Sequence, residues 1–232
     1  MTCEPLGDGL LLEPVSAVSS LAFVVAGVVI AVGYLRPLRG SRHEGAMSDG
    51  AATVTTGPRA LGYPALVAGI GIGSFVEHGP DPAYADLAHD LPLLATLAFV
   101  AADSAAALTG RPRLWWWWAL PTLALVPLIV LAPRAGDLAQ VLVAVVAVAL
   151  TRVRARAQPP ARRRVGWAVS LLALGGLIGT LSRAGGPLCV PDSLWQGHAV
   201  WHVLAATALV VLAPVVQRRA GPVHTPEAGR DS

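Results

Sequence analysis

The chain has 232 residues, of which 54% are hydrophobic and only 13% charged, and its mean hydropathy is +0.60. The apolar residues fall in long blocks, which are typical of membrane-spanning helices and exclude an ordinary soluble domain. The formal net charge of +3, without an aromatic-basic patch, gives no indication of a nucleic-acid partner. We therefore expect an all-α, polytopic membrane protein.

Seven apolar segments follow one another along the chain, separated by prolines, glycines and arginines. They cover approximately residues 14–35, 60–78, 87–109, 114–132, 135–151, 163–182 and 196–216. The sequence therefore predicts a single seven-helix transmembrane bundle over residues 1–216. Residues 217–232 are polar and contain proline and glycine, so we expect a disordered cytoplasmic tail.

The distribution of arginine predicts the orientation of the bundle. Of the 17 basic residues, 15 follow the first, third, fifth and seventh segments, and only Arg134 and Arg183 lie in the other loops. Because positively charged loops stay in the cytoplasm, we expect the N-terminus outside and the C-terminus inside. The segment before the first span has Glu4, Asp8 and Glu13 and no basic residue, unlike a cleaved signal peptide, so the first span is expected to be retained.

The two cysteines, Cys3 and Cys189, both fall on the outer side in this topology. A pair of cysteines in an oxidising compartment permits a disulfide, which would join the N-terminal segment to the loop before the seventh span. Two free thiols are the alternative.

Histidines gather at one end of the predicted bundle. The second span ends "GSFVEHGPD", the third opens "ADLAHDLPLL" and the seventh opens "LWQGHAVWHVL". All three ends share the outer face in the predicted topology, and ionisable groups inside spans usually mark function. Two other histidines, His43 and His224, lie in arginine-rich polar segments and are expected to be solvated.

His198 and His202 are one helical turn apart, so both imidazoles point the same way and are spaced to bind one metal ion. His78 is the candidate third ligand, with Ser74 one turn earlier on the same face. His89 is either a spare ligand or a loop residue. Histidines that only hydrogen-bond to water or lipid headgroups are the alternative interpretation.

This set of residues suits a hydrolytic site. A zinc ion held by three neutral imidazoles lowers the pKa of bound water toward ~7. Asp90, at a similar depth, would take the proton of that water and give it to a leaving amine. Ser74 would hydrogen-bond the oxygen that becomes negative in a tetrahedral intermediate. We expect the substrate to be a lipid amide whose acyl chain lies within the bundle.

The motifs "GSFVEH", "HDLP" and "GHAVWHVL" together resemble the alkaline ceramidase family, and "CEP" at 3–5 with "EPVSAVSSLAF" at 13–23 is similar to its bacterial branch. That family belongs to a seven-span superfamily of membrane hydrolases that also includes progestin and adiponectin receptors and haemolysin III-like proteins. The resemblance implies a zinc amidase that cleaves the N-acyl bond of ceramide or a ceramide-like lipid. It further implies a bacterial plasma membrane protein whose active site lies near the extracytoplasmic face.

By position, the resemblance also implies roles for individual residues. The zinc ligands would be His78, His198 and His202, and the serine and aspartate of the site would be Ser74 and Asp90. A bridge between the two cysteines has a counterpart in the family.

The chain departs from the family at its N-terminus. Eukaryotic members carry a calcium site built from an Asp-Trp-Cys-Glu-x-Asn-like segment and a later glutamate, whereas here Thr2 precedes Cys3 and Leu6 replaces the asparagine. Glu4 and Glu13 alone are too few oxygen ligands for calcium, which takes about six or more. We therefore expect no calcium site.

A second departure concerns the first span. Asparagines usual in the family are absent there, and Ser16, Ser19 and Ser20 stand in their region. These serines are interpreted either as small residues for close helix packing or as part of the site.

Two other functions stay open. A receptor or stress-associated protein of the haemolysin-like branch would share the fold, although that branch resembles an N-inside arrangement. A proton or metal transporter would use Asp103 and Ser104 in the third span, although the sequence has no internal repeat; otherwise Asp103 hydrogen-bonds within the bundle. Nothing in the sequence indicates a protein partner.

Overall fold

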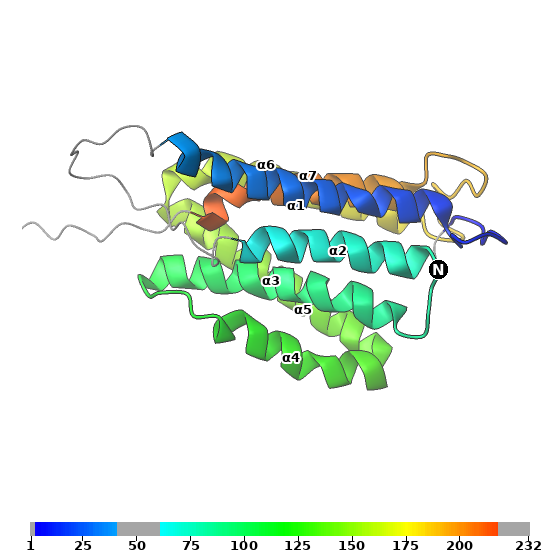
Figure 1. Cartoon of the computed structure of the whole chain (residues 1–232), viewed down its shortest axis with the longest axis horizontal. Helices are drawn as coiled ribbons and strands as arrows, with labels where there is room; N and C mark the ends of the chain where they lie inside the picture. Colours follow the sequence, from blue (N-terminus) through cyan, green and yellow to red (C-terminus); the bar gives the residue numbers. More distant parts are fainter. Residues whose placement is uncertain (1–2, 41–60, 218–232) are drawn as a thin grey trace, which may run out of the picture.

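The computed structural model describes residues 3–40 and 61–217. Within these ranges the chain forms seven helices and no strand, which confirms the predicted all-α class (Figure 1). The helices are α1 (Pro14–Gly40), α2 (Gly62–His78), α3 (Ala85–Thr109), α4 (Trp116–Leu131), α5 (Pro133–Ala157), α6 (Pro159–Leu181) and α7 (Gly197–Gln217). The predicted tail beyond Gln217 lies outside the described residues, as do His43 and His224.

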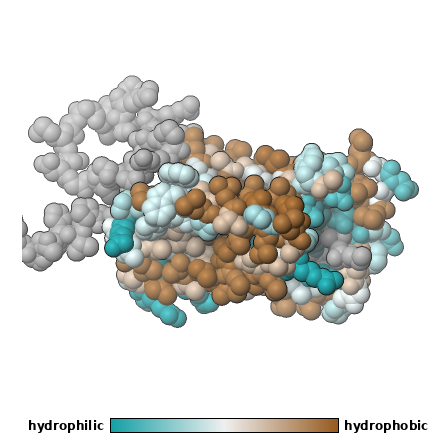
Figure 2. Space-filling view, turned by 90° about the horizontal axis from the view of Figure 1, so that it is seen from below, coloured by the Kyte–Doolittle hydropathy of each residue, from teal (hydrophilic) through white to brown (hydrophobic). Residues whose placement is uncertain are grey.

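Five of these helices, α1, α3, α5, α6 and α7, are long and apolar enough to cross a membrane. The helices α2 and α4, with 17 and 16 residues, are shorter than the ~20 residues that a bilayer core needs. Hydrophobic residues cover the middle of the face seen in Figure 2, and hydrophilic residues gather toward its two ends. The chain is therefore an integral membrane protein.

The helices lie side by side along one axis (Figure 1). Helix α1 packs against α2 and α7, α2 against α3, α3 against α4 and α5, and α6 against α7. In the apolar segments of α3 and α7, 50% of the residues are buried, compared with 22% in α5 and 17% in α6. Among the five long helices, α3 and α7 are thus the most buried, while α5 and α6 turn most of their side chains outward.

Two glycines let α2 approach its neighbours. A Cβ atom on Gly73 would overlap the backbone of Ala88 in α3, and one on Gly71 would lie 2.8 Å from the carbonyl oxygen of Ser20 in α1. Small residues at such positions allow helix backbones to come close in a membrane. They bring α1, α2 and α3 together at the end of the bundle where α2 ends.

The N-terminal segment is held against the start of α1. Cys3 forms a disulfide with Cys189 in the loop before α7, which confirms the predicted bridge. The neighbouring carboxylate of Glu4 is buried and accepts hydrogen bonds from the backbone N–H groups of Val15 and Ser16, at 2.6 and 2.9 Å. N–H groups in the first turn of a helix have no intrahelical partner, so Glu4 caps α1.

The arginine-rich loop predicted between the fifth and sixth spans is too long. Helix α5 continues to Ala157 instead of ending at 151, and only Gln158 separates it from α6. Arg154, expected in the loop, is buried and donates from Nη1 to Asp103 Oδ2 and from Nη2 to the carbonyl oxygen of Val215, both at 2.7 Å. Because these partners lie on α3 and α7, the burial of this arginine depends on tertiary packing.

Gly73→Ala is expected to destabilise the bundle, because the added methyl group must displace the backbone of Ala88 and such overpacking costs about 1–3 kcal/mol. Gly166→Ala is the matched control, since a Cβ there meets nothing within 4 Å and alanine favours helix. Thermal unfolding of both variants in the same detergent measures the difference. Equal melting temperatures for the two variants would contradict the close packing of α2 and α3.

Candidate metal centre

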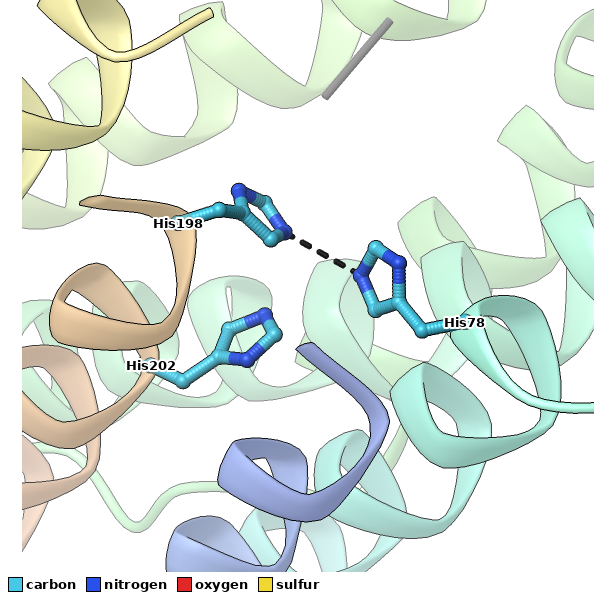
Figure 3. Close-up of side chains that lie close together, drawn as sticks. All are labelled: His78, His198 and His202. Carbon is cyan, nitrogen blue, oxygen red and sulfur yellow. Dashed lines mark hydrogen bonds between the residues drawn. The ribbon is translucent and has the colours of Figure 1, made fainter. Parts of the chain in front are cut away.

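Three histidines converge at the end of the bundle where α2 ends and α7 begins (Figure 3). His78 is the last residue of α2, and His198 and His202 lie in the first turns of α7. One ring nitrogen of each residue lies within 4.8 Å of the other two. The structure thus brings together the three side chains that the sequence singles out as metal ligands.

The tautomer of His78 follows from its contact with Glu13. His78 Nδ1 lies 2.7 Å from Glu13 Oε2, and an ionised carboxylate can only accept, so Nδ1 carries the hydrogen. In the neutral ring, Nε2 then has a free lone pair, and it lies 3.1 Å from Nε2 of His198. The side chains of His78 and Glu13 are only 8% and 13% exposed, so this bond is shielded from solvent.

The tautomer of His202 follows in the same way from Ser19. The hydroxyl of Ser19 donates to the carbonyl oxygen of Ser16 at 2.9 Å, and its oxygen lies 2.9 Å from His202 Nδ1. Since the single hydroxyl hydrogen is already used, His202 Nδ1–H is the donor and Nε2 keeps its lone pair. The ring is buried, and this Nε2 lies 3.4 Å from Ser74 Oγ.

This donor set fits a divalent ion such as zinc. Nitrogen ligands bind zinc at ~2.0–2.1 Å, so two ligands of a tetrahedral centre lie ~3.3 Å apart. The distance of 3.1 Å between the Nε2 atoms of His78 and His198 is close to that value. Two nitrogen lone pairs facing each other at this distance repel unless a proton or a cation lies between them. Three neutral imidazoles also match the ligands of a known class of catalytic zinc site.

Ser74, predicted to take part in catalysis, is buried beside the imidazoles. Its Oγ lies 2.8 Å from Ser20 Oγ, and Ser20 Oγ donates to the carbonyl oxygen of Ser16 at 2.9 Å. Ser20 therefore accepts the hydrogen of Ser74. Of the two interpretations of the serines in the first span, their contacts favour a part in the site.

Asp90, the predicted general base, lies in a second polar group formed by α2 and α3. His89 Nδ1 is 3.0 Å from Asp90 Oδ1 and 3.2 Å from Glu77 Oε2. Over the described parts of the chain, no hydrogen bond or ion pair joins Asp90 to the three converging imidazoles. Its role as the base stays a prediction, and His89 hydrogen-bonds to Asp90 beside Glu77 instead of joining the three histidines.

Among the described residues, Glu13 is the carboxylate that contacts the centre, whereas the sequence analysis named it only as an oxygen ligand of a calcium site that was not expected. It directly precedes α1, and the packing of α1 on α2 brings it to His78. The other acidic candidate, Glu4, caps α1. The one local signal for Glu13 is an acidic residue placed directly before an apolar span.

At the opposite end of the bundle, Asp103 has partners within the protein. Its Oδ1 accepts from Arg113 Nη1 at 3.0 Å, and its Oδ2 accepts from Arg154 Nη1. The guanidinium of Arg113 also lies over the ring of Phe99, 3.7 Å from its centroid. The bonding of Asp103 within the bundle, one of the two alternatives from the sequence, is therefore what the structure shows.

A cavity of about 310 Å³ lies between α2, α3 and α4. Its lining is apolar except for one threonine and consists of Leu66, Leu91, Pro92, Ala95, Trp118, Ala119, Thr122 and Leu123. None of the three histidines lines it.

No protein-family model matches the chain, and no curated protein matches it significantly.

Glu13→Ala is expected to lower the zinc affinity of the centre by about 10–100-fold, because a carboxylate on the second nitrogen of a ligating histidine fixes its tautomer and orientation. Glu13→Gln should lose less, since its amide oxygen still accepts the Nδ1 hydrogen. Asp8→Ala is the control, because Asp8 is exposed. Competition with a chelating dye measures the affinities, and equal values for Glu13→Ala and Asp8→Ala would refute the supporting role.

Proposed function

We propose that the protein is a zinc-dependent membrane amidohydrolase that cleaves the N-acyl bond of ceramide or a ceramide-like lipid. The observation that carries this proposal is the convergence of His78, His198 and His202 at one end of an apolar bundle. The motif resemblance to alkaline ceramidases, which includes these three histidines, supports the same reaction.

When bound, the zinc ion supplies Lewis acidity that activates water and polarises an amide carbonyl. The side chains of Glu13 and Ser19 hold the rings of His78 and His202 through their Nδ1 hydrogens. Fixing ligands in this way removes reorganisation from the reaction. The protein thus contributes a rigid, largely buried set of nitrogen donors.

Two side chains would act on the substrate. Asp90 would accept a proton from water at the carboxylate and deliver it to the leaving nitrogen. Its Oδ1 lies 3.0 Å from His89 Nδ1. Ser74 would donate its Oγ hydrogen to the substrate carbonyl oxygen after releasing Ser20.

The depth of the centre supports a lipid substrate. His202 lies five residues beyond Gly197, about 8 Å along α7, and His78 is the last residue of α2. The centre therefore lies where the apolar bundle meets its polar end. An N-acyl lipid carries its amide at the junction of acyl chain and headgroup, which is the same depth in a bilayer.

The alternatives are a receptor-like member of the superfamily without turnover and a transporter. A transport pathway would need Asp103 to exchange protons or metal, and the two arginine contacts of Asp103 favour a structural role instead. A receptor would share the whole geometry, so only a measurement of turnover separates it from the enzyme.

The function is tested by incubating the purified protein with a panel of N-acyl lipids, with and without a chelator. Wild type should hold near-stoichiometric zinc and release fatty acid, and the chelator should abolish release. His198→Ala should lose both zinc and activity, whereas Asp90→Ala should keep zinc and lose at least about 100-fold in turnover. His43→Ala is the histidine control.

The possible negative results show which part of the proposal is wrong. Zinc retained in His198→Ala would refute the proposed ligand set. Full activity in Asp90→Ala would refute the role of Asp90 as the base. A protein that holds zinc and releases no fatty acid from any lipid would favour the receptor.

We further propose that all seven helices span the membrane with the N-terminus outside. The shorter helices α2 and α4 are about 26 and 24 Å long, and a bilayer of ~30 Å thins locally around short spans. Both pack against α3, which is long enough to cross. The excess of arginine in the loops assigned to the cytoplasm supports the orientation.

Engineered cysteines test this topology, because both native cysteines are in the disulfide. Ala83→Cys, exposed between α2 and α3, should react with an impermeant maleimide on intact cells. Ala157→Cys, exposed at the end of α5, should react only after lysis. The reverse pattern would show that the orientation is opposite to the proposed one. Labelling of both positions from outside would show that α3, α4 and α5 do not all cross the membrane.

A further inference from the structure

The junction of α5 and α6 carries an exposed group of arginines. Helix α5 ends at Ala157 and α6 begins at Pro159, so the two helix ends are directly adjacent. Five arginines near this junction are exposed, and we name them the arginine rim: Arg152, Arg156, Arg162, Arg163 and Arg164. Arg154 is not part of it, because its guanidinium is buried against Asp103.

Within the described part of the chain, no acidic side chain pairs with the arginine rim. No aspartate or glutamate occurs between residues 138 and 191. Among the ion pairs of the described residues, none involves an arginine of the rim. Five positive charges are thus held together on two helix ends, and their repulsion favours a bound anion.

The length of α6 places the rim at the depth of lipid headgroups. No charged side chain occurs between Arg164 and the end of α6 at Leu181, a distance of about 26 Å along the helix. The hydrocarbon core of a bilayer is ~30 Å thick, so when this segment crosses it, Arg164 lies at its edge. The rim therefore faces the phosphate layer.

Exposed apolar side chains lie close to the arginine rim in the sequence, and they indicate that the bound anion is a lipid. Trp167, one turn farther along α6, is 59% exposed, and Val153 on α5 is 45% exposed. Tryptophan is enriched where headgroups meet acyl chains. A soluble anion would contact only the guanidinium groups, whereas a phospholipid would contact the arginines with its phosphate and Trp167 with its chains.

We propose that the arginine rim is a binding surface for the headgroup phosphates of anionic phospholipids. The planar guanidinium group donates two parallel hydrogen bonds to a phosphate, and it is more weakly hydrated than an ammonium group. Each basic residue near an anionic membrane surface contributes a factor of about 5 to association. The surface is independent of the histidine centre, which lies at the other end of the bundle.

The experiment is a lipid titration of the full-length protein in detergent, followed by native mass spectrometry. Phosphatidylglycerol and phosphatidylcholine with the same acyl chains are compared. Wild type should bind phosphatidylglycerol at least about 5-fold more tightly, and R162Q/R163Q/R164Q should lose this preference. R134Q/R183Q, which removes the two exposed arginines of the opposite end, should keep it.

Further variants separate folding from binding. R152Q/R156Q removes the α5 part of the rim and should reduce the preference even if the triple variant does not fold. R162K/R163K/R164K keeps the charge and should keep part of the preference.

Three outcomes would overturn the proposal: a preference unchanged in both glutamine variants of the rim, an equal loss in R134Q/R183Q, or displacement of the lipid by excess inorganic phosphate.

Discussion

Inside an apolar bundle, a buried polar atom finds its partner within the protein or not at all, because the surrounding hydrocarbon offers none. This constraint organises both ends of the molecule. At one end, both carboxylate oxygens of Asp103 are paired with arginines, Arg113 and Arg154. At the other end, the Nε2 atoms of His78 and His198 face each other at 3.1 Å, an arrangement that a proton or a cation completes.

Helix α1 supports the candidate metal centre, although none of the three converging histidines belongs to it. Glu13, directly before the helix, holds the ring of His78, and Ser19, in its second turn, holds the ring of His202. The start of α1 is itself held by the Glu4 cap and by the disulfide beside it. The orientation of the imidazoles therefore depends on the N-terminal segment as much as on the helices that carry them.

The two ends of the bundle carry different kinds of polar groups. The histidine centre is largely buried and is built from neutral donors, which suits a divalent ion and an uncharged amide. The opposite end combines a closed internal ion pair with exposed arginines on α5 and α6. The two features lie at opposite ends of helices that are long enough to cross a membrane.

Properties that depend on residues close together in the sequence could be predicted from the sequence alone. The apolar blocks predicted seven helices in the right places, since hydropathy is local, and five of them are long enough to span a membrane. The spacing of His198 and His202 placed both on one helix face, and with only two cysteines a single disulfide pairing was open.

Contacts between helices were decided only by the tertiary structure. The hydrogen bond from His78 to Glu13 and the burial of Arg154 each join residues that are far apart in sequence, so no local pattern marks them. Helix α5 runs past its expected end because Arg154 finds its partners on α3 and α7, and a charge that would end an isolated apolar segment is neutralised by packing. Pairing of buried polar groups is a property of the assembled bundle, whereas hydropathy and helical spacing belong to the chain itself.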